Sequence, residues 1–285
     1  MYIQTVNLYQ LYGVKPPENA NCRLICCGLT TPETVSRNRK RPGVLILPGG
    51  GYSHTSLREA EPVALRFAAK GYAPFVLHYS CAPCTYPVAL REAAMAMRYI
   101  REHGADYEVN PRMVAAIGFS AGGHLCGTLG MLYDTPEVAD LGSAELLRPD
   151  ALGLCYPVAV AWGRTHAGSF RNISGGDDAL AAKLSLDALV RPDMPPVFLW
   201  HTREDASVPC RNSLILAQAL EEAGVDFSLH VYRKGCHGLS TADEMVYPVA
   251  RVPEHSWDVP GWPEVMMRFF GEIGFGILDE QGGNR

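Results

Sequence analysis

Short apolar runs alternate with amphipathic helical stretches along most of this chain of 285 residues. The runs cover residues 44–47, 73–79, 113–118, 151–156, 197–202 and 227–232. Because nearly every residue in them is apolar, they are typical of strands buried on both faces. Strands of this kind that alternate with helices form a mostly parallel sheet with helices on both faces. The sequence therefore predicts an α/β fold.

The stretches between these runs carry helix signals. Ser56 and Glu59 have the spacing of a capping box, and the helix that they would open ends at Gly71, a residue suited to a positive φ. Residues 87–103 and 212–223 predict two further helices, because their apolar residues fall on one side.

The remaining segments complete the expected layout. Residues 1–30 are expected to add antiparallel edge strands to the sheet. We find no repeat or linker, so residues 1–285 are predicted to form a single domain. Two segments rich in Gly, Pro and charge, 163–178 and 240–259, follow predicted strands. Active-site loops lie at that end of the strands in open α/β sheets.

Composition excludes several classes of function. The net charge of −5 and the pI near 6.0 disfavour a nucleic-acid partner, and no basic cluster suggests membrane binding. The apolar runs are too short to span a bilayer, and the first 13 residues do not resemble a secretory signal. Nine cysteines, an odd number, favour reduced thiols over a disulfide framework. We therefore expect a cytoplasmic protein.

One pentapeptide carries the strongest chemical signal. Residues 118–122 read Gly-Phe-Ser-Ala-Gly, a G-x-S-x-G pattern that follows a predicted strand and precedes a helix of small residues. A strand that turns this sharply into a helix presents the serine Oγ above the edge of the sheet, and bulky residues at 118 and 122 would collide with the turn. Ser120 is the predicted nucleophile.

A serine hydroxyl needs a base and an acid to become nucleophilic. In this fold class the order along the chain is serine, acid, histidine. His237 lies in a loop after the last predicted strand, and Asp205 follows the strand before it, with Glu204 as the adjacent rival. The expected triad is Ser120, Asp205 and His237.

The other histidines and acids receive different interpretations. His201 and His124 are expected to be structural, and Asp177 and Asp178 are expected to cap a helix. Three histidines lie in loops that could touch substrate, namely His54, His166 and His255. Tyr52 and His54, which follow the glycine run, are the predicted substrate contacts.

Three consecutive glycines follow the first strong strand, in Pro48-Gly-Gly-Gly51. Such a run lets backbone amides approach one point closely, as an oxyanion hole requires. We assign the amides of Gly50, Gly51 and Ala121 to this role. A phosphate loop is the rival interpretation, but no G-K-[ST] follows.

Cys81 and Cys84 have C-x-x-C spacing, which also occurs in redox and zinc motifs. Because no second ligand pair follows at a suitable spacing, we interpret them as adventitious cysteines. No metal and no cofactor is expected.

These blocks together resemble a known family. Residues 47–72, 118–125 and 195–240 are similar to α/β-hydrolase esterases of the acetyl-esterase and xylan-esterase type, relatives of the hormone-sensitive-lipase group. The resemblance implies the same triad and hydrolysis of short acyl esters, including acetyl groups on sugars. Pro48 stands where many of those relatives have histidine. About forty residues precede the first core strand, so little or no cap domain is expected.

Two alternatives to an esterase stay open. The same triad could serve an amidase, a formamidase or a small peptidase, and the fold could also serve as a catalytically inactive ligand receptor. The expected partner is a small-molecule ester, with neither nucleic acid nor membrane. The sequence leaves the oligomeric state open, a homo-oligomer included.

Overall fold

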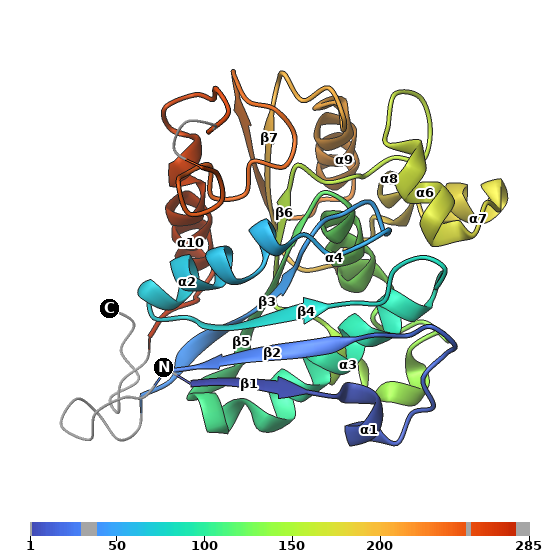
Figure 1. Cartoon of the computed structure of the whole chain (residues 1–285), viewed down its shortest axis with the longest axis vertical. Coiled ribbons are helices and arrows are strands. Elements are labelled where there is room, and N and C mark those ends of the chain that lie inside the picture. Colours follow the sequence, from blue (N-terminus) through green and yellow to red (C-terminus); the bar gives the residue numbers. More distant parts are fainter. Residues whose placement is uncertain (1, 30–38, 249–251, 278–285) are drawn as a thin grey trace.

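A computed structural model describes residues 2–29, 39–248 and 252–277. Within these residues eight strands form one sheet in the order β1-β2-β4-β3-β5-β6-β7-β8 (Figure 1). The strands are β1 (Tyr2–Val6), β2 (Arg23–Gly28), β3 (Arg41–Leu47), β4 (Ala73–His78), β5 (Val109–Phe119), β6 (Ala151–Cys155), β7 (Val197–Thr202) and β8 (Phe227–Tyr232).

The sheet is mostly parallel, as predicted. Neighbouring strands from β4 to β8 pair in parallel, whereas β2 is antiparallel to both β1 and β4. The antiparallel edge expected from residues 1–30 is therefore confirmed. The assignment of residues 1–285 to one domain stays a prediction.

Helices cover both faces of the sheet, because successive strand residues point to opposite sides. Along β3, Val44 and Ile46 belong to an apolar cluster that also contains residues of α2 (Glu61–Ala69) and α10 (Trp262–Glu272). The opposite face carries α1 (Leu8–Tyr12), α3 (Val88–His103), α4 (Ala121–Leu132) and α9 (Arg211–Glu222). Figure 1 shows α2 and α10 on one side of the strands and α3, α4 and α9 on the other.

The register places the carboxyl ends of the central strands at one edge. Leu47 pairs with Gly118, Phe119 with Cys155, and Cys155 with Trp200. The loops that follow β3, β5, β6, β7 and β8 consequently emerge side by side. This edge is where ligands bind in open α/β sheets.

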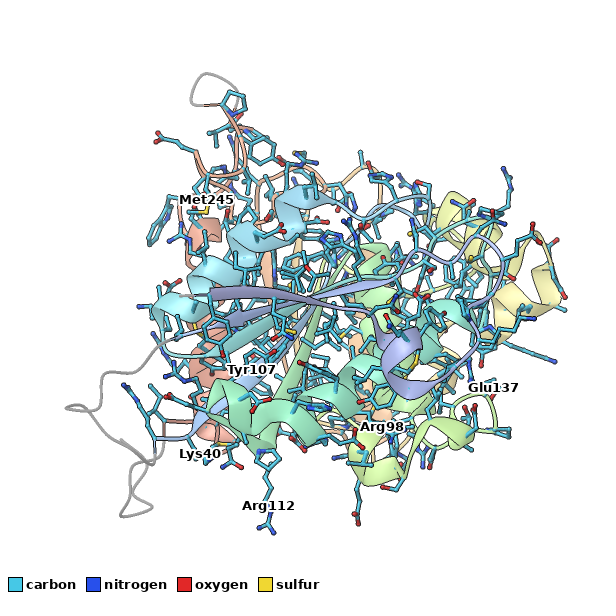
Figure 2. The ribbon with its side chains drawn as sticks, turned by 60° about the horizontal axis from the view of Figure 1, so that its bottom comes forward. Lys40, Arg98, Tyr107, Arg112, Glu137 and Met245 are labelled. Atoms are coloured by element: carbon cyan, nitrogen blue, oxygen red, sulfur yellow. The ribbon has the colours of Figure 1, made fainter. Side chains whose placement is uncertain are left out.

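Aromatic side chains pack together beside the edge strands of the sheet. Tyr107, labelled in Figure 2, packs its ring against Phe75 of β4 and Tyr2 of β1, with centroids 5.0 and 6.2 Å apart. Arg112 in β5 and Met245 beyond β8 lie on opposite sides of the molecule in the same view.

None of the helices in the described part of the chain has the length and apolar character needed to cross a bilayer.

Two local predictions were wrong. The capping box does not form, because the Ser56 side chain makes no capping hydrogen bond and residues 57–59 form a separate 3-10 turn ahead of α2. The Glu59 carboxylate is used elsewhere, as described below. The segment 163–178 is not only loop, since it contains α6 (Ala167–Ser174) and the start of α7 (Asp178–Lys183).

Short helices thus lie between β6 and β7, with α8 (Leu186–Leu189) following α7. α5 (Ala144–Leu147) precedes β6. Among residues 2–29, β1, α1 and β2 lie at the edge of the sheet. Of the second predicted loop, 240–259, residues 249–251 lie outside the described residues.

Candidate active site

Ser120 occupies the turn between β5 and α4. Its φ of 53° and ψ of −117° are unusual for a residue with a side chain. The turn is tight enough to exclude Cβ atoms at both flanking glycines. A Cβ on Gly118 would lie 2.1 Å from the carbonyl oxygen of Gly122, and one on Gly122 would lie 2.1 Å from that of Leu47. The glycines of the motif are therefore required by sterics.

The structure brings the three predicted triad residues together. His237, in the loop after β8, places Nε2 2.7 Å from Ser120 Oγ. Its Nδ1 lies 2.6 Å from Asp205 Oδ2, in the loop after β7. Base and orienting acid are thus both at hydrogen-bond distance, which is the geometry that nucleophilic serine chemistry needs.

Asp205 is buried and held on both oxygens. The backbone amides of Ser207 and Val208 donate to Oδ1, at 3.0 and 2.8 Å. Burial disfavours the charged carboxylate, but hydrogen bonds from His201 and His237 outweigh it and hold the pKa of Asp205 well below its usual range. The carboxylate is therefore ionised at neutral pH, oriented toward His237 Nδ1.

The glycine loop that follows β3 faces Ser120. Gly50 and Gly51 have φ values of 127° and 65°, and a Cβ on Gly50 would lie 2.1 Å from the His54 carbonyl oxygen. Within the described residues the amides of Gly50, Gly51 and Ala121 donate to no protein acceptor. They are available to a ligand oxygen.

Neighbouring side chains fix this loop from outside. Tyr79 Oη donates to the carbonyl of Pro48 at 2.7 Å, and Asn172 Nδ2 of α6 donates to that of Gly51 at 2.8 Å. The Gly49 amide donates to Glu59 Oε2 at 2.9 Å. Residues from three separate segments thus pair with backbone groups of Pro48, Gly49 and Gly51.

A cavity of about 390 Å³ opens over Ser120. Its lining residues are glycines and residues with polar side chains, with no large aliphatic or aromatic hydrophobic side chain among the described residues. The lining residues are Gly50, Gly51, Ser53, His54, Ser56, Arg58, Glu59, Ser120, His166, Gly168, Asn172, Ser207, His237 and Gly238. The α6 segment thus supplies one wall.

The structure places only one of the two predicted substrate contacts at the cavity. His54 lines the cavity, but Tyr52 does not: its side chain is 2% exposed and its hydroxyl lies 2.8 Å from His124 Nδ1. Tyr52 is turned into the core, so its prediction as a substrate contact was wrong. His166 also lines the cavity, whereas His255 bonds the carbonyl of Pro253 and does not line it.

The other histidines and acids that were interpreted as structural lie away from the cavity. His124 is buried, and burial lowers its pKa to about 4. His201 lies 2.8 Å from both Ser213 Oγ and the carbonyl of Val208. Asp177 caps α7, and the neighbouring Asp178 lies in its first turn. The rival acid Glu204 pairs with Arg203 at the surface.

Sequence reasoning missed several residues around the cavity. Glu59 was assigned to a capping box, and Asn172 and Arg58 were not singled out. The guanidinium of Arg58 stacks over the Tyr247 ring at 5.0 Å. The sequence gives only a weak signal for such residues, because the tertiary fold determines whether a polar side chain points into the cavity.

The nine cysteines are spread over several elements of the fold. None of the nine forms a disulfide, including Cys81 and Cys84. Burial raises the pKa of Cys81 to about 12, which disfavours the reactive thiolate. The described residues contain no cluster of metal-ligating side chains.

This sheet order, with a serine on the turn from the fifth strand into a helix, defines the class as the α/β-hydrolase fold. Two family models match separate parts of the chain. The BD-FAE model matches residues 30–145, and that of the prolyl oligopeptidase family matches residues 172–256.

A solved structure of a related protein shows the family to which this chain belongs. An acetyl ester-xyloside bifunctional hydrolase from Caldicellulosiruptor lactoaceticus has a crystal structure with a TM-score of 0.76 and 34% identity, covering 89% of each chain. The chain therefore belongs to the α/β-hydrolase family, in its acetyl-esterase-like branch.

Two curated relatives are longer proteins. The endo-1,4-beta-xylanase B of Butyrivibrio fibrisolvens is 36% identical over 72% of this chain and 33% of its own length. An acetylxylan esterase of Xylanibacter ruminicola is 29% identical over 72% of this chain and 42% of its own length. The chain thus spans less than half of these relatives.

Proposed function

We propose that this protein is a serine carboxylic ester hydrolase that removes short acyl groups from polar alcohols such as sugars. The observation that carries the proposal is the continuous contact from Ser120 Oγ through His237 to the buried Asp205, beside unpaired amides. The family to which the chain belongs supports it.

The proposed reaction has two steps. His237 Nε2 accepts the proton of Ser120 as Oγ attacks the ester carbonyl, and the amides of Gly50, Gly51 and Ala121 stabilise the resulting oxyanion. His237 returns the proton to the leaving alcohol. Water then attacks the acyl-enzyme with the same imidazole as base, and the acid is released. Asp205 orients the imidazole throughout and stays ionised.

The lining of the cavity supports a short acyl group and a polar alcohol. Each buried methylene group contributes about 0.8 kcal/mol only where it meets an apolar wall. This cavity offers hydroxyl, imidazole, amide and guanidinium groups, which hydrogen-bond to sugars instead. Acetyl esters of carbohydrates fit this chemistry better than long-chain lipids.

The test is a panel scored by kcat/KM. Acetyl, butyryl and octanoyl esters of one chromogenic alcohol, together with acetylated xylosides, would be compared in the wild type and in Ser120→Ala. We expect acetyl esters to be preferred over octanoyl, and Ser120→Ala to lose about a million-fold in kcat. A fluorophosphonate should label the wild type only. Absence of labelling would favour the inactive-receptor alternative.

Amide hydrolysis is the second candidate, because residues 172–256 match the prolyl oligopeptidase family. The same triad could cleave an aminoacyl amide or a formamide. Adding aminoacyl anilides and arylformamides to the panel separates the two candidates. Turnover of an anilide above that of every acetyl ester would replace the esterase proposal.

We further infer a cytoplasmic location. All nine cysteines are unpaired, which supports a reducing compartment. Cell fractionation followed by detection of the chain tests this inference.

A further inference from the structure

We propose that Glu59 is a positioning residue that, through Tyr156, ties the glycine loop of the oxyanion hole to the loop that carries His237. This inference rests on the proposed ester hydrolysis. It adds a structural link between the oxyanion hole and the loop that carries the general base. Neither Glu59 nor Tyr156 takes part in the chemistry proposed above.

Glu59 is a buried carboxylate with a specific partner on each oxygen. It is 3% exposed, and Oε2 accepts from the Gly49 amide while Oε1 accepts from Tyr156 Oη at 2.6 Å. A buried charge is costly unless it is fully hydrogen-bonded. The carboxylate is thus anchored next to the peptide that leads into Gly50 and Gly51.

Tyr156 extends the link toward the histidine loop. It follows β6 directly with a φ of 37°, and its hydroxyl accepts from the Ser240 amide at 3.0 Å. Burial, with the nearby Glu59, raises the pKa of this phenol, so it stays protonated and donates to the carboxylate. Its ring also packs edge-on against His237, at 5.1 Å.

A second contact joins the same two segments. Ser240 Oγ donates to the carbonyl of Arg58 at 2.5 Å, and the carbonyl of Ser240 accepts from Trp262 Nε1 of α10. Ser240 lies three residues beyond His237 and has a φ of 54°. Residues 58–59 and 240 are therefore joined twice, once directly and once through Tyr156.

The link has a functional consequence because one loop supplies the proposed oxyanion amides and the other supplies His237. The amides must meet the oxyanion while His237 faces Ser120, and complete removal of one oxyanion donor costs about 100- to 1000-fold in kcat. Loosening Glu59 or Tyr156 should therefore lower kcat and spare KM.

The chain contains a matched control elsewhere. Glu92 is 0% exposed and accepts from Tyr9 Oη at 2.7 Å and from the Ser80 amide and hydroxyl. None of these groups lines the cavity over Ser120. Tyr9→Phe and Tyr156→Phe thus remove the same kind of hydrogen bond, from two different networks.

The experiment compares Tyr156→Phe, Glu59→Gln, Tyr9→Phe and Glu92→Gln on an acetyl ester. We expect kcat to fall about 10- to 100-fold in the two site variants with KM within about threefold, as for a weakened oxyanion hole. Affinity for a trifluoromethyl ketone, which mimics the tetrahedral intermediate, should fall in parallel. Both control variants should lose melting temperature and keep kcat.

Two outcomes overturn the inference. In one, folded Tyr156→Phe and Glu59→Gln keep wild-type kcat and ketone affinity. In the other, Tyr9→Phe loses as much kcat as Tyr156→Phe, which would indicate a general effect of stability. Because Phe keeps the ring of Tyr156, that variant answers the question even if Glu59→Gln fails to fold. A wild type without ester turnover would instead refute the proposed function.

Discussion

Two imidazoles converge on one carboxylate in this molecule. Asp205 Oδ2 lies 2.6 Å from His237 Nδ1 and 3.4 Å from His201 Nε2, while Oδ1 accepts two backbone amides. The carboxylate is consequently fixed in one rotamer. At the scale of single residues, this fixed orientation determines which ring nitrogen of His237 carries the proton.

Asp205→Asn tests this role. The amide can still accept from Ser207 and Val208, so the fold should persist, but it no longer favours a proton on His237 Nδ1. We expect kcat for an acetyl ester to fall by about 10⁴. Glu204→Gln changes the exposed neighbour and should stay within about twofold. A large loss of kcat in Glu204→Gln, without a loss in Asp205→Asn, would instead identify Glu204 as the acid of the triad.

The same carboxylate makes stability depend on pH. The pKa of Asp205 is lowered on folding, so its ionisation stabilises the native state above its unfolded pKa near 4, and this contribution is lost as pH falls further. We expect the gap in unfolding free energy between wild type and Asp205→Asn to shrink from pH 6 to pH 3. Urea titrations at several pH values measure it, and a gap that widens toward acid contradicts the assignment.

Sequence reasoning anticipated which side chains lie together where a motif restricts the backbone, and the catalytic roles of these residues stay predictions. Ser120, Asp205 and His237 were named from a glycine pattern and from chain order, and the structure brings them together. Glu59 was misassigned because its partner Tyr156 is 97 residues away, and local spacing suggested a capping box instead. Tyr52 was misassigned because position in a loop does not determine which way a side chain points.

At the scale of elements, the turn between β5 and α4 is held by close contact with the end of β3. A Cβ on Gly122 would meet two backbone oxygens, those of Leu47 and Pro48, at 2.1 and 2.4 Å. Because backbone atoms cannot rotate away as a side chain can, either the turn or β3 would have to move.

Gly122→Ala should therefore destabilise the fold by about 3 kcal/mol or more and abolish activity. Gly271→Ala is the matched control, since a Cβ there meets nothing within 4 Å in the exposed end of α10. Relief of glycine entropy should stabilise that variant by about 0.5 kcal/mol. Thermal unfolding of both variants measures the difference, and a wild-type melting temperature in Gly122→Ala would refute the packing argument.

Element prediction was most accurate inside the sheet. Residues 197–202 and 227–232 were predicted as strands with the observed bounds. β7 is buried throughout, as expected for a largely apolar run in a parallel sheet, whereas β8 at the sheet edge is mostly half-buried. Between β6 and β7, α6 was missed, and of α7 only the capping aspartates Asp177 and Asp178 were predicted. α6 and α7 are short and begin with caps from His166 and Asp177 in a glycine-rich stretch, which hides their periodicity.

At the scale of the whole molecule, thiol burial is uneven. Cys236 is the one cysteine classed as exposed among nine that the structure describes, and it precedes His237. Most of the others are buried, and burial raises the pKa of Cys22, Cys126 and Cys155, which slows reaction through the thiolate.

A chromogenic disulfide reagent should therefore titrate about one thiol rapidly in the native protein and all nine after unfolding. Cys236→Ser should remove the fast phase. Labelling of Cys236 is also expected to inhibit ester hydrolysis by crowding the adjacent loop. Several fast thiols in an active, folded sample would contradict the packing described above.

Ser120 and His237 stand 117 residues apart in the chain. At about 5–20 residues per second, a ribosome takes roughly 6 to 23 s to travel from one codon to the other. During that interval the nascent polypeptide carries the serine while the imidazole has not been synthesised. Hydrolytic competence would thus be acquired late in translation, and a premature stop codon in this interval would yield an inert product.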